Sequence, residues 1–424
     1  MLAAQGRSLL GEGMAEMHVV GEIVQQEPAL VLSPLSGNEQ YCLLQRGLQP
    51  GTFCLGNHVF SLGLVGNVRS LFTSLSGGTN QTDATFMSKN RLEAISRLER
   101  EARATSMDGI VGVQAEIIHH AGGVLEFLAT GGGVTWQASK LPAEGSPGFD
   151  FFTAACSGEQ LSCLLDLGFV PAKMVFGTES YSRGLGGALT GGLRVMFVSG
   201  EVPEFSETFM AARRTALHRL RDEAYKLGAS FVSGVKLSSM NYGLLTEVSF
   251  LGTACRHPAL PIPMSPDDVI TSGFSEQELW SLCSQGYFPK TVVMAVSIYN
   301  MGMGNDLKNF FQNLGGGELT SFSGLITEAR HRVQSKILEQ ARQAGACEVL
   351  GLQTDIENFA GAGCIEFFAY GTAVHKSKLV APQSEQLSPQ HFMMERTAFC
   401  SNSNLNSHRR PGHKCEVGQM HGAP

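Results

Sequence analysis

Arginine and glutamate each recur three times in this chain, at matching places of a repeated pattern. The arginines are Arg91, Arg213 and Arg330, and the glutamates are Glu126, Glu247 and Glu366. An arginine side chain binds carboxylates and phosphates through charge-assisted hydrogen bonds. A glutamate could take part in proton transfer only if it were buried, and we expect a solvated carboxylate at the end of a strand instead. We therefore expect each arginine to bond carbonyls or a carboxylate of a neighbouring repeat and so to fix the register between repeats, with a small anionic ligand in a groove between repeats as the less favoured interpretation.

A second group of residues with ligand chemistry lies near the C-terminus. The candidate metal ligands are Cys400, His408, His413 and Cys415. Thiolate and imidazole groups bind zinc and other transition metals, but the spacing lacks the closely paired cysteines of structural zinc sites. A solvated polar tail is the favoured interpretation, and metal binding by the tail is the alternative. No cofactor is predicted for the chain.

Cysteines inside the repeats do not form a metal-binding pattern. A site inherited with the repeat would place ligand residues at equivalent positions in all three copies. Cys54, however, is equivalent to Val175 and Val293, and no position is Cys or His throughout. Cysteines that alternate with valine behave as small apolar core residues. We therefore expect no transition-metal site that belongs to the fold itself.

The repeated pattern spans most of the chain. Its clearest marks are Gly47-Leu-Gln-Pro50, Gly168-Phe-Val-Pro171 and Gly286-Tyr-Phe-Pro289, which lie 121 and 118 residues apart. Solenoid repeats have periods of roughly 20–50 residues, so this longer period indicates three copies of a small domain. The predicted division is an N-terminal extension at 1–32, repeats at 33–137, 153–257 and 271–377, and a disordered tail at 383–424.

Each copy opens with a short predicted helix. Its start is a serine followed three residues later by glutamate or glutamine, a capping box in which each side chain bonds a free backbone N–H. The serines are Ser36, Ser157 and Ser275. A glycine 11 residues after each serine predicts a left-handed helix end, and a proline three residues further prevents continuation.

A long helix and the strands around it predict the architecture. In the first copy Arg91, Ile95, Leu98 and Ala102 recur with the helical period as one stripe, and we place the arginine in the first helical turn. A strand precedes this helix, and two strands follow it as an antiparallel hairpin, with the glutamate at the start of the last strand. The fold class is therefore α+β, with three tandem modules, each a small antiparallel sheet with a short capped helix and a long helix packed on it.

Composition and charge exclude two classes of partner. The chain has 424 residues, of which 43% are hydrophobic, and a net charge of −7. It contains no run of lysine or arginine of the kind that binds nucleic acid. It also lacks an apolar secretory segment and a stretch of about 18 apolar residues that would span a membrane. We expect a cytoplasmic protein that self-associates or arranges its three copies in a pseudo-symmetric way within one chain.

Several short stretches follow the signature of a known family. They are Ala212-Arg213-Arg-Thr-Ala216 in the long helix, Leu227-Gly228-Ala229-Ser-Phe-Val232-Ser-Gly234 at its exit and Gly371-Thr-Ala-Val374 near the end of the last strand. In order and spacing they resemble the YbjQ-like family, whose domains are described as heavy-metal-binding. The resemblance implies a small α+β subunit that assembles into rings, usually pentamers, and it implies no reaction. Three fused copies would form part of such a ring or a complete pseudo-symmetric particle.

Common catalytic signatures are missing from the sequence. Gly184-Leu-Gly-Gly187 lacks the Gly-Lys-Ser/Thr ending of a phosphate-binding loop, and no Gly-x-Ser-x-Gly or His-Glu-x-x-His motif occurs. The sequence therefore favours a non-catalytic scaffold for assembly or for binding of a small ligand. The alternatives are a metal-binding or metal-sensing protein that uses Cys and His groups, and an enzyme with a site in a groove between repeats.

Overall fold

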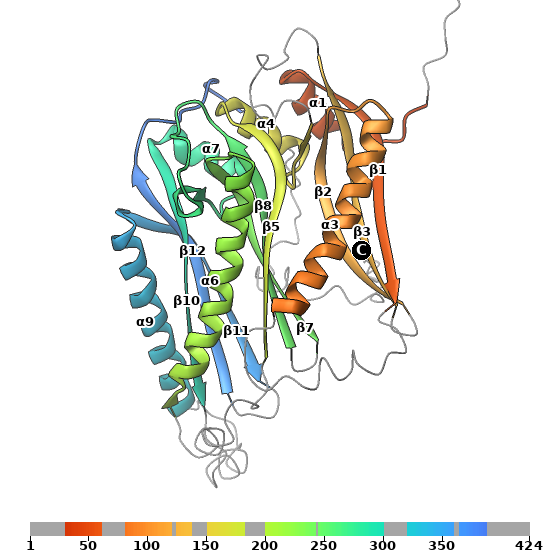
Figure 1. The fold of residues 1–424 in the computed structure, drawn as a ribbon. Helices are drawn as coiled ribbons and strands as arrows, with labels where there is room; N and C mark the ends of the chain where they lie inside the picture. Colours follow the sequence, from red (N-terminus) through yellow and green to blue (C-terminus); the bar gives the residue numbers. More distant parts are fainter. Residues whose placement is uncertain are drawn as a thin grey trace, which may run out of the picture.

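Three sheets, each accompanied by a long helix, stand side by side in this protein (Figure 1). The structure is a computed structural model. It describes residues 30–61, 81–120, 124–137, 151–182, 200–242, 245–300, 320–359 and 364–387. We number the sheets with their helices as modules 1, 2 and 3 in chain order. The α+β class with three tandem modules, predicted from the sequence, is confirmed.

Three long antiparallel strands form each sheet, with the last strand of the module in the middle. Module 1 contains β1 (Leu48–Ser61), β2 (Gly109–His120) and β3 (Val124–Trp136). Module 2 contains β5 (Val170–Ser182), β7 (Phe231–Tyr242) and β8 (Leu245–Arg256). Module 3 contains β10 (Tyr287–Asn300), β11 (Glu348–Phe359) and β12 (Cys364–Lys376). The hairpin expected after each long helix is therefore present in all three modules.

The short helices form as their sequence signals predict. They are α1 (Gly37–Gln45), α4 (Gly158–Asp166) and α7 (Glu276–Ser284), and each starts with the expected capping box. Each is followed by a glycine with φ between 78° and 85°, a left-handed conformation that only glycine adopts without strain. The three helices lie next to one another at one end of the sheets (Figure 1). There they share an apolar core that contains Leu43, Leu161 and Leu279.

A long helix covers one face of each sheet. These helices are α3 (Gln81–Ala104), α6 (Pro203–Lys226) and α9 (Thr320–Gln343). α3 and α6 approach their sheets closely at Gly56 and Gly177. A Cβ added at Gly56 would lie 2.2 Å from the backbone N of Leu98, and one at Gly177 would lie 2.0 Å from the carbonyl O of Ala216. The equivalent position of β10 is Ala295, so α9 leaves room there for a methyl group.

The repeated arginine lies in the middle of the long helix, and the prediction that it stands in the first turn is wrong. Arg91, Arg213 and Arg330 are each the eleventh residue of a helix of 24 residues. The helices start earlier because the residues before the arginine also form helical turns. That part of the sequence differs between the copies and carries no shared start signal. A helix N-terminus therefore does not stand beside these arginines to favour an anion.

Two-residue strands at the start of modules 2 and 3 extend the sheet of the preceding module. β4 (Phe152–Thr153) pairs in parallel with β2, and β9 (Ile270–Thr271) pairs in parallel with β7. β6 (Gly200–Glu201), which precedes α6 of module 2, pairs antiparallel with β10 of module 3. The predicted antiparallel sheets are therefore completed by strands from neighbouring repeats. Strands this short show no alternation in the sequence, so the pattern did not predict them.

The apolar core continues across the module boundaries. In module 1 Ile95 and Leu98 of α3 pack together with Met174 and Phe176 of β5 in module 2. The core around α6 in the same way includes Val292, Met294, Val296 and Ile298 of β10 in module 3. α3 and α6 are thus each buried between their own sheet and the next one. α9 lies at the outer end of the row (Figure 1).

None of the helices in the described ranges combines the length and the apolar content needed to cross a bilayer. A 3₁₀ turn at Pro266–Asp268 lies in the connection between modules 2 and 3. The connecting segments around Gly77, Gly191 and Gly315, which the sequence marks as glycine-rich, lie outside the described residues.

The close approach of α6 to its sheet predicts that a methyl group added at Gly177 costs more stability than one removed at Ala295. Gly177→Ala is expected to lower the free energy of unfolding by about 1–3 kcal/mol, the usual cost of overpacking, because the new Cβ meets helix backbone that cannot move aside. Urea denaturation of the intact chain measures this difference. The matched control Ala295→Gly should cost only about 0.5–1 kcal/mol of backbone entropy. A Gly177→Ala protein as stable as the parent would contradict the close packing of α6.

Candidate functional site: the junctions between modules

Arg91 reaches from module 1 into module 2. Its Nη2 donates to Oε1 of Glu247 at 3.0 Å, and its Nη1 donates to Oγ1 of Thr178 at 3.3 Å. The guanidinium carbon also lies 5.5 Å from the ring centre of Phe176. Both charged side chains are largely removed from solvent. Because α3 carries the arginine and β8 the glutamate, this pair joins the helix of one module to the sheet of the next.

The second junction repeats the same ion pair. Arg213 of α6 pairs with Glu366 of β12, with 2.5 Å between Nη2 and Oε1. Its guanidinium carbon lies 4.2 Å from the ring centre of Phe368. Both side chains are buried. The expectation of a solvated glutamate at the strand end is therefore wrong for Glu366, as it is for Glu247. Arg213 and Glu366 are the counterparts of Arg91 and Glu247, so the same ion pair joins the modules at both junctions.

The third arginine and the remaining glutamate lie at opposite ends of the row. Arg330 is exposed on α9 of module 3. Glu126 of β3 accepts a hydrogen bond from Nδ2 of Asn57 at 3.2 Å and bonds Nε2 of His120 at 2.8 Å. The bond with His120, together with that from Asn57, lowers the pKa of Glu126. The six residues singled out in the sequence therefore make two ion pairs, and Arg330 and Glu126 do not pair with each other.

The buried ion pairs are suited to fixing the position of one module relative to the next. Moving two charges out of water costs several kcal/mol per ion, which their attraction repays only when the geometry is good. A slip between modules would separate Arg213 from Glu366 and leave each charge buried without compensation. At Arg91 and Arg213 a carboxylate of the protein already occupies the position that an anionic ligand would take. This geometry favours ion pairing over anion binding at both junctions.

Asp166 at the end of α4 joins all three modules, and the sequence analysis missed it. Its Oδ2 accepts a hydrogen bond from Nε1 of Trp280 in module 3 at 2.6 Å. Its Oδ1 accepts from Oγ of Ser384 at 2.6 Å and pairs with Nη2 of Arg46 in module 1 at 2.8 Å. The equivalent residues in the other copies are Gln45 and Ser284. Because the position is not shared, a comparison of the repeats gave no signal for it.

The described cysteines are mostly core residues, as the alternation with valine predicted. Eight of them form no disulfide, and all of these except Cys347 are buried. Burial raises the pKa of Cys54 and Cys364 to about 11 and that of Cys163 and Cys283 to about 12. At neutral pH these groups are protonated thiols, which are poor nucleophiles and poor metal ligands.

No metal-binding cluster occurs among the described residues. In those parts of the chain, no three His, Cys, Asp or Glu side chains are grouped so that they could hold a metal ion. The tail candidates Cys400, His408, His413 and Cys415 lie outside the described residues.

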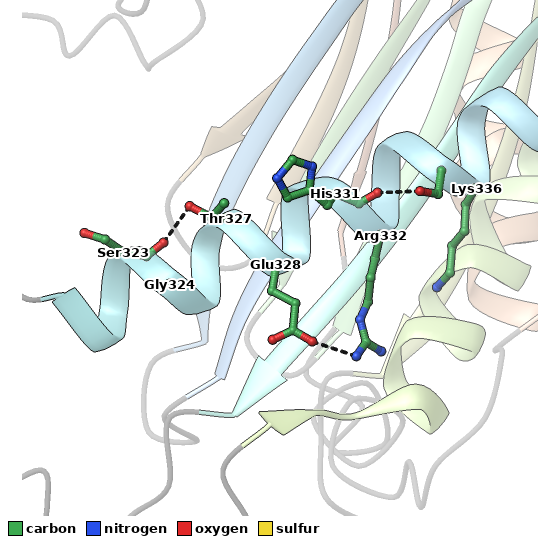
Figure 2. A pocket seen from close by; sticks show the side chains of 8 residues that line it. Ser323, Gly324, Thr327, Glu328, His331, Arg332 and Lys336 are labelled. Atoms are coloured by element: carbon green, nitrogen blue, oxygen red, sulfur yellow. Dashed lines mark hydrogen bonds and ion pairs between the residues drawn. The ribbon is translucent and has the colours of Figure 1, made fainter.

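A shallow depression runs along α9 (Figure 2). All the residues that line it come from this one helix, and they include His331, Lys336 and the ion pair between Glu328 and Arg332 at 2.8 Å. Binding sites for small molecules are concave and bury most of the ligand surface between several elements. A depression on a single exposed helix does not provide such an enclosure.

Comparisons with known proteins agree with the repeated architecture. The sequence profile of the YbjQ family, described as "Putative heavy-metal-binding", matches residues 49–137, 171–257 and 289–377. An encapsulin nanocompartment protein of Mycobacterium tuberculosis is 32% identical over 249 residues, which cover 56% of this chain and 90% of that protein. UPF0145 proteins of Acinetobacter baylyi and Thermoplasma acidophilum are 33% and 39% identical over 96 and 94 residues. These matches cover 23% and 20% of this chain and 84% and 78% of the relatives.

The buried pair at the second junction predicts a non-additive mutational result. Arg213→Met is expected to lower the free energy of unfolding by about 3–5 kcal/mol, because the positive charge that faces the buried Glu366 is lost. Combining it with Glu366→Leu should recover most of that loss, since neither charge of this buried pair then remains. Denaturant titration of the single and double variants checks this. Arg100→Met, on the exposed face of α3, is the control and should change stability by less than about 0.5 kcal/mol. A double variant as unstable as the single one would argue against the pairing.

Burial of the thiols predicts selective chemical labelling. Iodoacetamide at pH 8 should alkylate the exposed Cys347 in the folded protein and leave Cys163 and Cys283 unmodified, because the raised pKa of each buried thiol keeps it protonated. Denaturant should abolish the difference. Mass spectrometry of the digested protein assigns the label to each cysteine, and rapid native labelling of Cys163 would contradict this burial.

Proposed function

We propose that this chain, which belongs to the YbjQ family and contains three fused copies of its domain, is a non-catalytic scaffold that works by assembly. The observation that carries the proposal is the repetition of one interface within the chain. A shared long helix, an Arg–Glu ion pair and a short parallel strand connect module 1 to module 2. The same three features connect module 2 to module 3. An interface used twice in a heterologous, head-to-tail way can be extended by further units.

The chemistry of the described residues supports a scaffold more than an enzyme. Catalysis by acid, base or nucleophile needs a positioned group of suitable pKa next to a substrate-sized cavity. The two buried arginines are engaged by carboxylates, and burial keeps the core thiols protonated. The depression on α9 is open and has a single wall. The functional chemistry that these residues offer is therefore the joining of modules.

The relatives are consistent with an assembly role. The Mycobacterium tuberculosis protein is named for a nanocompartment, and the similarity covers most of its length. The UPF0145 proteins match about one module each, so the module also occurs outside a fused array. The description of the family as heavy-metal-binding keeps metal binding as the second candidate function.

Native mass spectrometry, together with light scattering over a wide range of concentration, tests the proposal. The full chain is expected to form species of a whole-number multiple of the chain mass, with no stoichiometric metal ion retained. A chain that stays monomeric at every concentration would overturn the assembly role. A metal ion retained at a fixed ratio would favour the second candidate function.

A further inference from the structure

Among the residues that the structure describes, no element covers the outer face of the sheet in module 1. In modules 2 and 3 the equivalent face packs against the preceding long helix, and Phe176 of β5 is only 4% exposed. Its counterpart on β1, Leu55, is 38% exposed. Further along this face Val59 is exposed, whereas its counterparts Ser180 and Ile298 are buried. We name this surface of module 1 the front face.

At the opposite end of the row, module 3 exposes the elements that are equivalent to those packed against the next sheet in modules 1 and 2. On α3 and α6 the equivalent residues Glu99 and Arg221 contact Lys173 and Thr291 of the following sheet. The residue at this position of α9 is Leu338, which is 49% exposed. We name this surface, formed by α9 and the outer edge of β11, the rear face.

The outer edge of β11 also lacks the parallel strand that β2 and β7 carry, among the residues that the structure describes. At β2 the first bond of that pairing runs from the N–H of Phe152 to the carbonyl of Asp108 at 3.2 Å. The equivalent carbonyl at β11 belongs to Cys347. On the same edge Leu352 is 45% exposed, whereas its counterpart Val113 is buried.

The segment that corresponds to β4 and β9 stands exposed in module 1. Leu30, Val31 and Leu32 form a run of exposed apolar residues. Their counterparts in module 2 include Phe152 and Thr153, which are buried against module 1. An exposed apolar run and an unpaired strand edge are two features that soluble proteins normally cover. The two partners of one strand addition are therefore present at the two ends of the row of modules.

We infer that the rear face of one copy of this chain binds the front face of a second copy and so reproduces the internal junction. This inference rests on the proposed assembly function and assigns its contact surface. Residues 30–33 of the second copy add in parallel to β11 at Glu348 and Val349. Arg330 of the first copy pairs with Glu126 of the second, and Leu338 packs on the uncovered face of β1.

Charge and placement both support a contact between two copies. Arg330 is a cation and Glu126 an anion, and the equivalent residues form the ion pair at both internal junctions. Asn57 beside Glu126 is the counterpart of Thr178, which accepts a hydrogen bond from Arg91 at the first junction. The two faces lie at opposite ends of the row, so one chain does not close on itself (Figure 1).

A charge-swap series tests the pair, with assembly of the full chain followed by light scattering and native mass spectrometry. Arg330→Glu and Glu126→Arg each place like charges at the contact and should raise the dissociation constant by about tenfold or more. The double variant Arg330→Glu/Glu126→Arg restores opposite charges and should recover assembly. Arg100→Glu makes the same change of charge on the outer face of α3 and is the matched control, expected to assemble normally. Unchanged far-UV circular dichroism and urea midpoints would show that each variant folds.

A proline pair tests the strand addition. Val31→Pro removes the N–H that is equivalent to the donor of Phe152 and should weaken assembly by about tenfold or more, since proline cannot donate to a ladder. Leu32→Pro is the neighbouring control. N–H groups alternate in direction along a strand, so this change leaves the donors of Val31 and Ser33 in place and should weaken assembly less.

The outcomes separate this inference from the proposed function. A parent chain that assembles, single swaps that weaken assembly and a double swap that restores it would support the assigned surface. If the parent assembles and the single swaps have no effect, or the double swap restores nothing, the surface is wrong and the scaffold function stands. A parent that never assembles overturns both.

Discussion

The sharing of one helix between two sheets is the constraint on which the rest of this structure depends. α3 and α6 each turn one side to their own sheet and another to the sheet of the following module. The contact between each of these helices and the sheet of its own module depends on glycine, because Gly56 and Gly177 let the helix backbone approach closely. Contact with the next sheet uses the side chains of Ile95 and its neighbours. A module can therefore bury its helix fully only when another module follows.

This constraint explains why charged residues are buried at the junctions. A helix between two sheets must keep its register with both, and apolar packing alone is tolerant of small slips because it has little directionality. An arginine with a fixed fork of donors pairs with a carboxylate in a defined geometry. Thr178 and the ring of Phe176 surround Arg91 on the partner sheet. The ion pair thus fixes the relative position of two modules whose interface is largely apolar.

The polar cluster at the ends of the short helices adds a second connection of different design. Asp166 bonds Arg46 of module 1, Trp280 of module 3 and Ser384 of the segment that follows module 3. Val380 of that segment is buried in the core shared by the three short helices. The chain after module 3 therefore packs back onto all three modules. Relative motion between modules would have to break both the helix junctions and this cluster, which favours one fixed arrangement for the row.

The sequence by itself determined the features that depend on contacts over a few residues. Capping boxes, left-handed glycines and the order of helix and hairpin were all predicted, because a serine meets the backbone N–H three residues away and φ is a property of one residue. The repeat also identified the arginine and glutamate positions. Only the tertiary structure decided that Arg91 meets Glu247, 156 residues away, and that Arg330 is exposed. Three equivalent arginines look alike in the sequence, and their environments differ because two are followed by another module and the third stands at the end of the row. Asp166 and the two-residue strands escaped prediction for the same reason, since their partners come from other modules.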